Sequence, residues 1–446
     1  MNNKISAKQW MSFIVAGFVG QIAWALENMY LNVFAFRSSG SYDFIPIMTA
    51  ASAVAATITT LLMGALSDRL GKRKAFITFG YIIWGISILI FALFDTHSPA
   101  SIVGNSAMLA GTMIVIMDCV MTFFGSTAND AAFNAYVTDN TNENNRGKVE
   151  GALAIMPMIA MIMMTVLGGV LVPNKDSSWL IFFIIFGGMT TIAGIALLFL
   201  LPKDSLKPNK EEPYFKNIFY GFRPSVIKAN PLLYITLVGF GVFCISVQIF
   251  FPYLIVYMQN VLGLADMNFI ITMGVVLVVA CIITVIFGLF MDKIGKNKIL
   301  IPSICFAALG ALLFFFAKDM VFTIIAGIIL MSGYLVSTAV FSAKIRDFTP
   351  KEGVGLFQGI RLIFMVLIPM VTGPYIGKAL MLINEETYID PEFGIESIQP
   401  NQYIFLGAML FFLLTLIPVV ILLRKEKKSI APVIEENNEQ QNDSTI

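Results

Sequence analysis

Twelve apolar stretches, each long enough to cross a lipid bilayer as a helix, recur along this chain of 446 residues. A helix needs ~20 mostly apolar residues to span a hydrocarbon core of ~30 Å. With 57% hydrophobic and 13% charged residues, the chain carries more apolar surface than a soluble fold can bury. We therefore predict an all-α membrane protein that has the lipid bilayer as its solvent. The predicted spans are residues 11–36, 43–66, 75–94, 103–134, 149–172, 178–201, 230–258, 267–291, 298–317, 319–343, 354–382 and 401–423.

The remaining composition excludes several classes of function. The net charge of +1 argues against a nucleic-acid partner. The single histidine, His97, lies in a short polar loop, and the four cysteines are scattered through apolar runs. No metal-ligand spacing and no pair of a nucleophile with a base is visible. We therefore expect a protein that is not an enzyme and has no metal site or cofactor. We also expect a monomer.

Basic residues are distributed very unevenly between the loops. Of the 29 lysines and arginines, 24 lie in alternate loops and in the two terminal segments. The opposite loops hold only Arg37, Lys175 and Lys318. Because cytoplasmic loops of membrane proteins are enriched in Lys and Arg, we predict that both termini are cytoplasmic. This arrangement requires an even number of spans, and we expect the protein to lie in the cell (plasma) membrane.

Two sequence patterns occur once in each half of the chain. GALSDRLGKRK begins at Gly64 and GLFMDKIGKNK at Gly288, an offset of 224 residues. NAYVTDNT begins at Asn134 and SAKIRDFT at Ser342, an offset of 208 residues. Parallel repeats of this kind mark one architecture of membrane transporters. We therefore predict two pseudo-symmetric bundles of six helices.

The repeat and the polar segments divide the chain. The bundles are predicted at 1–201 and 230–423, joined by a cytoplasmic linker over 202–229 that is rich in proline and lysine. The tail over 424–446 is polar and lacks aromatic residues, which predicts disorder.

The repeated loop after the second span resembles the signature of the major facilitator superfamily. Its residues are Gly64, Asp68, Arg69 and Gly71, and the repeat makes Asp292 the counterpart of Asp68. Gly64 would permit close approach of helices, and Gly71 would allow a sharp turn. The resemblance covers nearly the whole chain. It implies that these residues control the inward gate and do not contact solute.

A narrower resemblance surrounds the fourth span. NDAAFNAYVTDNTNENNRGKVEG, from Asn129, is similar to the pattern of the glycoside–pentoside–hexuronide:cation symporters and the sucrose carriers. GQIAWALENMYLNVF, from Gly20, resembles the first helix of sucrose-type carriers. These resemblances imply a sugar or glycoside as the solute, with a coupling cation. Melibiose-type members place acidic residues on the second helix where this chain has Thr60 and Ala56, so a proton is favoured over sodium.

Four ionisable residues lie at bilayer depth within the predicted spans, namely Glu27, Asp118, Asp130 and Arg361. Such residues are costly in lipid and are functional candidates by default. A buried carboxyl group can take up and release a proton near neutral pH. We rank Asp130 first as the proton carrier for its family match, then Glu27, then Asp118, with a structural helix contact as the alternative for each. Arg361 either reaches toward the cytoplasm or pairs with an acidic residue across the halves, and we place it among the gating residues.

A polar face on the first span is the predicted solute site. Gln21, Trp24, Glu27, Asn28 and Asn32 lie within an arc of about 140° if the segment is helical. An aromatic ring can pack on the apolar face of a sugar while polar groups bind its hydroxyls. A buried helix–helix contact would explain the same face. The predicted solute-binding residues are Gln21, Trp24, Asn28, Asp130, Gln248 and Tyr253.

The function that these features favour is secondary active transport, with proton-coupled symport of a sugar or glycoside by alternating access. A drug or metabolite exporter of the same superfamily is one alternative. A membrane sensor or scaffold that does not transport is another. The identity of the solute, the direction of transport, the coupling ion and the oligomeric state stay open.

Overall fold

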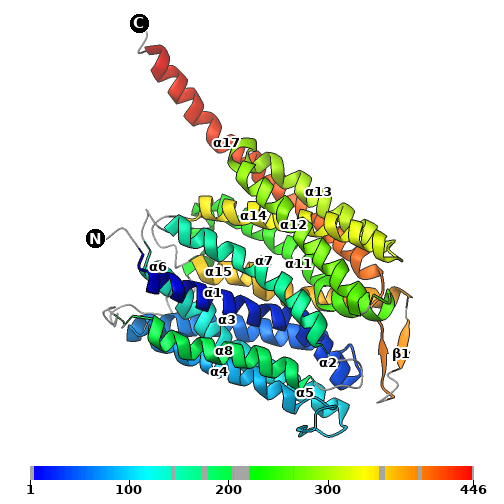
Figure 1. Ribbon diagram of the computed structural model, residues 1–446. Helices are drawn as coiled ribbons and strands as arrows, with labels where there is room; N and C mark the ends of the chain where they lie inside the picture. Colours follow the sequence, from blue (N-terminus) through cyan, green and yellow to red (C-terminus); the bar gives the residue numbers. More distant parts are fainter. Residues whose placement is uncertain are drawn as a thin grey trace.

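The computed structural model describes residues 5–141, 146–172, 179–202, 204, 220–264, 266–350, 357–384, 386–389 and 394–443. Within these residues the protein consists of long helices and one two-stranded hairpin (Figure 1).

The first half contains the first six predicted spans. They correspond to α1 (Ala7–Leu26), η1 (Glu27–Leu31) and α2 (Asn32–Ser39); α3 (Phe44–Leu70); α4 (Arg73–Ile90) with η2 (Phe91–Leu93); α5 (Ala107–Gly125), η3 (Ser126–Phe133) and α6 (Asn134–Asp139); α7 (Arg146–Leu171); and α8 (Leu180–Leu200).

The second half begins after the part of the linker that falls outside the described residues. Its elements are η4 (Tyr220–Phe222) and α10 (Pro224–Ala229); α11 (Pro231–Val256) with η5 (Tyr257–Val261); α12 (Asp266–Ile294); α13 (Lys296–Phe315); α14 (Met320–Phe348); α15 (Gln358–Leu362), η7 (Ile363–Leu367), α16 (Ile368–Met381) and η8 (Leu382–Asn384); β1 (Thr387–Ile389) and β2 (Glu396–Ile398); and α17 (Tyr403–Asp443).

The prediction of a helical multi-pass membrane protein is confirmed. Among the described residues, 11 helices are long and apolar enough to cross a membrane. The remaining predicted span is α7, whose apolar part, Ile155–Leu171, is shorter. The side chains of these helices that face outward are largely aliphatic, as a lipid environment requires.

Two segments differ from the sequence-based expectation. The last predicted external loop forms the antiparallel hairpin β1–β2, in which Thr387 pairs with Ile398. The segment 424–443, expected to be disordered, continues α17 as a helix. Extending a preformed helix avoids the cost of nucleation, and the many Lys, Glu and Gln residues there are good helix formers.

Within the described parts of the chain, four spans contain a wider, π-helical segment. These segments are η1, η3, η5 and η7, and two of them, η1 and η5, lie in the first helix of each half. A π-helical turn changes the direction of the side chains that follow it, and such turns are frequent at functional sites. The repeat in sequence is therefore accompanied by a repeat in local structure.

The repeated loops lie at one end of the molecule, which we call the motif end; the opposite end, with β1 and β2, is the hairpin end. Gly71 and Gly295 have φ angles of 62° and 94°, so both adopt the left-handed conformation that glycine allows. This confirms the predicted sharp turn. An ion pair follows each turn, Arg73–Asp139 in the first half and Lys296–Asp347 in the second.

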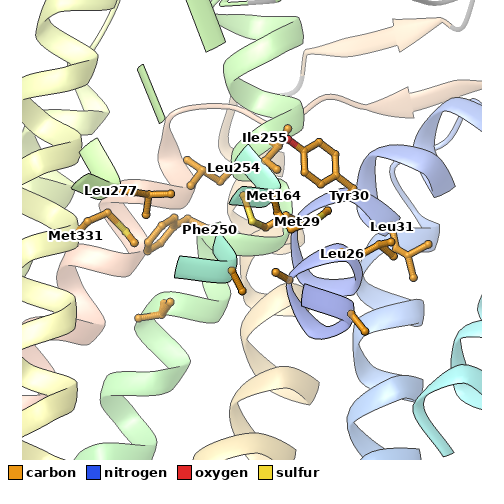
Figure 2. Packing of buried hydrophobic residues seen from close by; sticks show 14 of the residues in the cluster. Leu26, Met29, Tyr30, Leu31, Met164, Phe250, Leu254, Ile255, Leu277 and Met331 are labelled. Atoms are coloured by element: carbon orange, nitrogen blue, oxygen red, sulfur yellow. The ribbon is translucent and has the colours of Figure 1, made fainter. Parts of the chain in front are cut away.

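The two halves contact each other at the hairpin end. Lys378 Nζ lies 2.8 Å from Asp43 Oδ1, and Asn260 donates a hydrogen bond of 3.2 Å to the Tyr42 hydroxyl. Tyr388 of β1 packs on the ring of Tyr42. Deeper in the molecule, Figure 2 shows buried side chains of η1 and α7 beside those of α11.

Candidate functional site

The Glu27 carboxyl group lies among three helices of the first half. Its Oε1 accepts a hydrogen bond of 2.6 Å from Ser52 on α3 and one of 3.3 Å from Thr122 on α5. The two hydroxyl oxygens are 3.1 Å apart. Asp118, one helical turn before Thr122, is close enough to Glu27 for their charges to interact. Glu27 is 7% exposed and Asp118 is 1% exposed, so the predicted proton candidates Glu27 and Asp118 share one buried site.

Asp130 occupies a different position on the same span. It lies in η3 and accepts a hydrogen bond of 3.0 Å from Ser126, one turn earlier. Its side chain is partly exposed, whereas the neighbouring Asn129 is buried and donates to the Tyr81 hydroxyl at 2.6 Å. The Tyr81 hydroxyl in turn donates to the Ala16 carbonyl oxygen. Asn129 therefore joins α1, α4 and η3, and Asp130 is left facing a less enclosed region.

Trp24, a predicted sugar-stacking residue, packs on Trp84 of α4, with ring centroids 4.9 Å apart. Gly125 lies against both rings, because a Cβ atom there would be 2.7 Å from Trp84 and 3.0 Å from Trp24. The Trp84 Nε1 atom is buried and has no hydrogen-bond partner within the described residues. Trp24 itself is partly exposed, so one part of its ring remains accessible.

The remaining predicted solute-binding residues are dispersed. Asn28 lines a pocket between the halves and donates to the Trp24 carbonyl oxygen. Gln21 and Gln248 are partly exposed, and Gln248 packs against Gly373 of α16. Tyr253 is fully buried in the second half and donates to the Pro374 carbonyl oxygen at 2.8 Å. Trp24, Asn28 and Asp130 thus lie in the first half, whereas Tyr253 is held in a helix contact within the second half.

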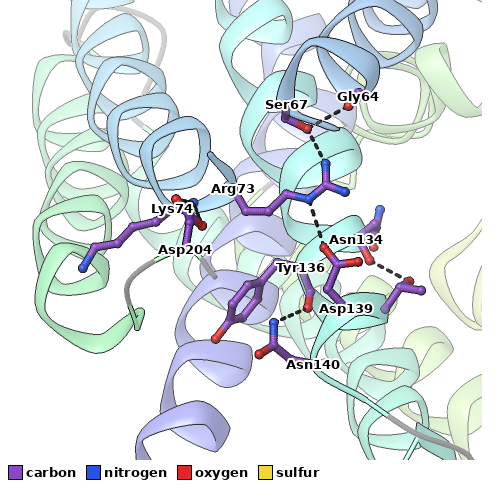
Figure 3. A network of polar contacts seen from close by, with 10 residues as sticks. Gly64, Ser67, Arg73, Lys74, Asn134, Tyr136, Asp139, Asn140 and Asp204 are labelled. Carbon is purple, nitrogen blue, oxygen red and sulfur yellow. Dashed lines mark hydrogen bonds and ion pairs between the residues drawn. The ribbon is translucent and has the colours of Figure 1, made fainter. Parts of the chain in front are cut away.

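The predicted gating loop of the first half contains a chain of polar contacts (Figure 3). Arg73 donates to Asp139 at 3.1 Å through Nε and to the Ser67 hydroxyl through Nη1. Ser67 donates to the Gly64 carbonyl oxygen at 2.8 Å. Arg73 is 8% exposed. It was not among the predicted gating residues, because in the sequence it is one of several basic residues expected in any cytoplasmic loop.

The other predicted gating residues differ in their exposure and contacts. A Cβ atom on Gly64 would meet only Ala131, at 3.9 Å, so close helix packing does not require glycine there in this structure. Arg69 is exposed. Arg361 contacts Met365 on its own helix, with Nε and Sδ 3.2 Å apart. The side chains of Asp68 and Asp292 lie outside the described part of the chain, so their roles stay predictions.

A comparison with known proteins identifies the family. The model of the Major Facilitator Superfamily matches residues 10–374 and, in a second match, residues 285–442. The chain belongs to the Major Facilitator Superfamily. Among curated proteins, none matches the sequence closely enough to be called a relative.

Solved structures of several transporters share the fold. A crystal structure of the nucleoside transporter NupG superposes with a TM-score of 0.69, 12% identity and coverage of 92% of this chain and 99% of that one. For a D-xylose–proton symporter the TM-score is 0.67, the identity 14% and the coverage 92% and 97%. For the xylose transporter XylE from E. coli these values are 0.63, 12%, 91% and 97%. At such identities the similarity concerns the fold, and the narrower resemblance to the glycoside–pentoside–hexuronide group stays a prediction.

One pocket of this superfamily member lies between its halves and is mostly apolar. Met29 and Met161 line it from the first half, and Met258, Met273 and Met331 line it from the second. Its polar side chains are Asn28, Thr272 and Thr323. This pocket could not be predicted from the sequence, since methionines in apolar spans usually serve packing.

Proposed function

We propose that the protein is a secondary transporter that moves a sugar or glycoside together with protons by alternating access. Membership of the superfamily supports transport as the activity. The observation that supports proton coupling is the presence of three carboxyl groups inside the helices of the first half, those of Glu27, Asp118 and Asp130. Ionisable groups at such positions are costly and are retained for a function.

The proposed solute site lies beside these carboxyl groups. Trp24 offers part of an aromatic ring, and Asn28, one turn later, faces the pocket between the halves. Asp130 provides a partly exposed carboxyl group on the neighbouring span. An aromatic surface with nearby amide and carboxyl groups suits the apolar and hydroxyl faces of a sugar. The fold shared with a D-xylose–proton symporter is compatible with this solute class.

We further propose that the motif end faces the cytoplasm and that the protein lies in the plasma membrane as a monomer. The basic residues of the repeated loops support this orientation. Residues 1–201 and 230–423 would be the two bodies that rock against each other, connected by 202–229. The ion pair and aromatic contacts between the halves at the hairpin end would then close the outer side, leaving the inner side as the route of exchange.

Uptake into proteoliposomes tests this function. Purified protein should accumulate at least one of a panel of radiolabelled sugars when the pH outside is lower than the pH inside. A protonophore should abolish the accumulation without blocking equilibration. Failure of every sugar and glycoside in the panel, with correctly inserted protein, would refute the proposed solute class.

The Asp130→Asn variant tests the coupling residue. An amide mimics the protonated carboxyl group, so exchange of solute between equal pools should persist while accumulation driven by a pH gradient is lost. Asp130→Glu, which retains a carboxyl group, should keep part of the accumulation. If Asp130→Asn still accumulates solute in a proton-dependent manner, Asp130 is not the proton carrier.

The methionine-rich pocket favours a second candidate function, the export of a more apolar solute. Flexible, polarisable methionine side chains can adapt to ligands of varied shape. In this case an apolar dye would be transported in exchange for protons, in the direction opposite to proton flow, in the same vesicles. Sugars would not be transported. A sensor or scaffold, the candidate from another class, would move neither.

A further inference from the structure

The methionine-rich pocket belongs mainly to the second half and lies toward the hairpin end. Of its lining residues, only Asn28, Met29 and Met161 come from the first half. Thr272 and Thr323 lie near the starts of α12 and α14, two helices that begin at the hairpin end. Figure 2 includes Met29 of η1 and residues of α11 that line the pocket. The pocket is therefore a cavity of the second half that η1 and α7 cover.

Thr272 has a buried hydroxyl group without a hydrogen-bond partner. The residue is 0% exposed, and its Oγ1 has no partner among the described residues. A threonine inside a helix commonly donates to the carbonyl oxygen four residues earlier. Thr284 of the same helix does so toward Ala280, at 2.7 Å. Thr323, which also lines the pocket, does so toward Asp319 at 2.7 Å. The Thr272 hydroxyl is thus the one that a ligand in the pocket can engage.

The rest of the lining determines what such a ligand can be. Among the described residues that line the pocket there is no charged side chain, so an ionised ligand would be buried without a partner. The other polar side chains, Asn28 and Thr323, already donate to carbonyl oxygens of their own spans. A sugar would leave most of its hydroxyl groups unpaired there. Methionine side chains, in contrast, adapt well to an apolar body.

We propose that this pocket binds an uncharged, compact molecule with an apolar body and one hydroxyl or carbonyl group, which forms a hydrogen bond with Thr272. Met29 and Met161 contact this ligand from the first half, so it is held only while the halves are together at this end. A ligand that binds one arrangement better shifts the population toward it. The ligand therefore locks the protein closed at the hairpin end and is not the solute that is carried. The lock rests on the proposed alternating access, whereas the binding does not.

Equilibrium dialysis measures the binding. Purified protein in lipid nanodiscs is dialysed against radiolabelled 2-phenylethanol, and empty nanodiscs of the same lipid give the background. Ethylbenzene, which lacks only the hydroxyl group, is measured in the same way. We expect saturable binding of both probes, with an affinity about tenfold higher for 2-phenylethanol, which corresponds to about 1.4 kcal/mol. No saturable binding of 2-phenylethanol, or equal affinities for the two probes, would overturn the proposal.

Matched variants assign the site. Thr272→Val, which replaces the hydroxyl by a methyl group, should weaken 2-phenylethanol binding about tenfold and leave ethylbenzene binding unchanged. Thr272→Ser should keep the preference for the alcohol. Thr284→Val is the control on the same helix, since that hydroxyl bonds its own helix. Val276→Phe, which fills the pocket from α12, should abolish saturable binding of both probes. A preference for the alcohol that survives Thr272→Val would place the ligand elsewhere.

The rate of cysteine labelling tests the lock. Tyr42 is 2% exposed at the contact between the halves, so in Tyr42→Cys, made without the four native cysteines, a membrane-impermeant maleimide reacts when the hairpin end opens. Saturating 2-phenylethanol should slow this labelling at least about fivefold. With Thr272→Val added, the same slowing should need about ten times more of the alcohol. Unchanged labelling would overturn the lock, and so would faster labelling.

Asp130→Asn separates this proposal from the proposed function. The variant should lose proton-driven accumulation of sugar but bind 2-phenylethanol as the wild type does. A wild-type protein that binds the alcohol and moves no sugar would leave the pocket's ligand standing and refute the sugar symport. Proton-driven sugar uptake by a protein that does not bind the alcohol would do the reverse.

Discussion

At the residue scale, the hydrogen-bond partners of a polar side chain inside these helices distinguish a structural role from a functional one. The Tyr81 and Tyr253 hydroxyls each donate to a carbonyl oxygen of another helix, which explains their burial as helix contacts. Glu27 and Asp118 each keep one oxygen without a partner in the described structure. Because an unpaired buried oxygen costs free energy, those two atoms mark Glu27 and Asp118 as functional candidates more strongly than burial alone does.

Two adjacent glycines of α8 provide a prediction about packing. A Cβ atom on Gly187 would lie 2.8 Å from the Gly85 carbonyl oxygen of α4, whereas one on Gly188 would meet nothing within 4 Å. Gly187→Ala should lower the melting temperature, at a cost of about 1–3 kcal/mol, because the two helices must separate. Gly188→Ala should leave it unchanged or slightly higher, since alanine favours the helix. Thermal unfolding of both variants in one detergent checks this, and equal effects would mean that α4 and α8 are not packed as described.

The sequence allowed some site residues to be predicted but not others, for a physical reason. A carboxyl group in an apolar span is costly and therefore conspicuous, which is why Glu27, Asp118 and Asp130 could be predicted. A serine or threonine usually satisfies its own hydroxyl within the helix, so Ser52 and Thr122 carry no such signal. Their role depends on the packing of three separate helices, which is not encoded in local spacing.

At the element scale, the π-helical segments affect which side chains of the first span share a face. In a regular α-helix, which the sequence predicted, Glu27 and Asn28 would lie on one polar face. In the structure both lie at the start of η1, and they have different surroundings: Glu27 meets α3 and α5, whereas Asn28 lines the pocket between the halves. A π-helical segment has no distinct composition, so its position could not be predicted.

The two repeated ion pairs offer a comparison within one molecule. Arg73 and Asp139 are 8% and 28% exposed, whereas Lys296 and Asp347 are 27% and 49% exposed. Breaking a largely buried pair can cost about 3–5 kcal/mol, and breaking an exposed pair about 0–1 kcal/mol. Arg73→Gln should therefore lower both the melting temperature and the transport turnover more than Lys296→Gln.

Solute affinity should change little in either variant, because both loops lie at the motif end, away from the proposed solute site. The double exchange Arg73→Asp with Asp139→Arg should recover part of the turnover lost by Arg73→Asp alone. Equal losses for Arg73→Gln and Lys296→Gln, or a large loss of affinity, would contradict a conformational role for the Arg73–Asp139 pair.

At the scale of the whole molecule, the apolar spans predicted a helical membrane protein, because a lipid environment requires such spans. The repeats indicated two related halves. The contacts between the halves were not predictable. Asp43 and Lys378 each look like an ordinary charge in a loop or at the end of a span, and only the assembled fold brings them within 2.8 Å. The hairpin β1–β2 was missed as well, since its strands of three residues are too short for an alternating pattern to be visible.

The same interface yields a prediction about alternating access. If the halves must separate at the hairpin end during each cycle, a covalent link there should stop transport. Cysteines placed at Asp43 and Lys378, in a variant without Cys119, Cys244, Cys281 and Cys305, can be joined by a short thiol-cleavable linker. Solute uptake should fall to background on linking and return after reduction, while the single-cysteine variants treated in the same way keep their uptake.

Replacing Asp43 and Lys378 by uncharged residues, without the linker, should have a small effect, because an ion pair this exposed contributes only about 0–1 kcal/mol. Full uptake by linked protein would mean that the hairpin end does not open, and the proposed rocking of the two halves would have to be abandoned.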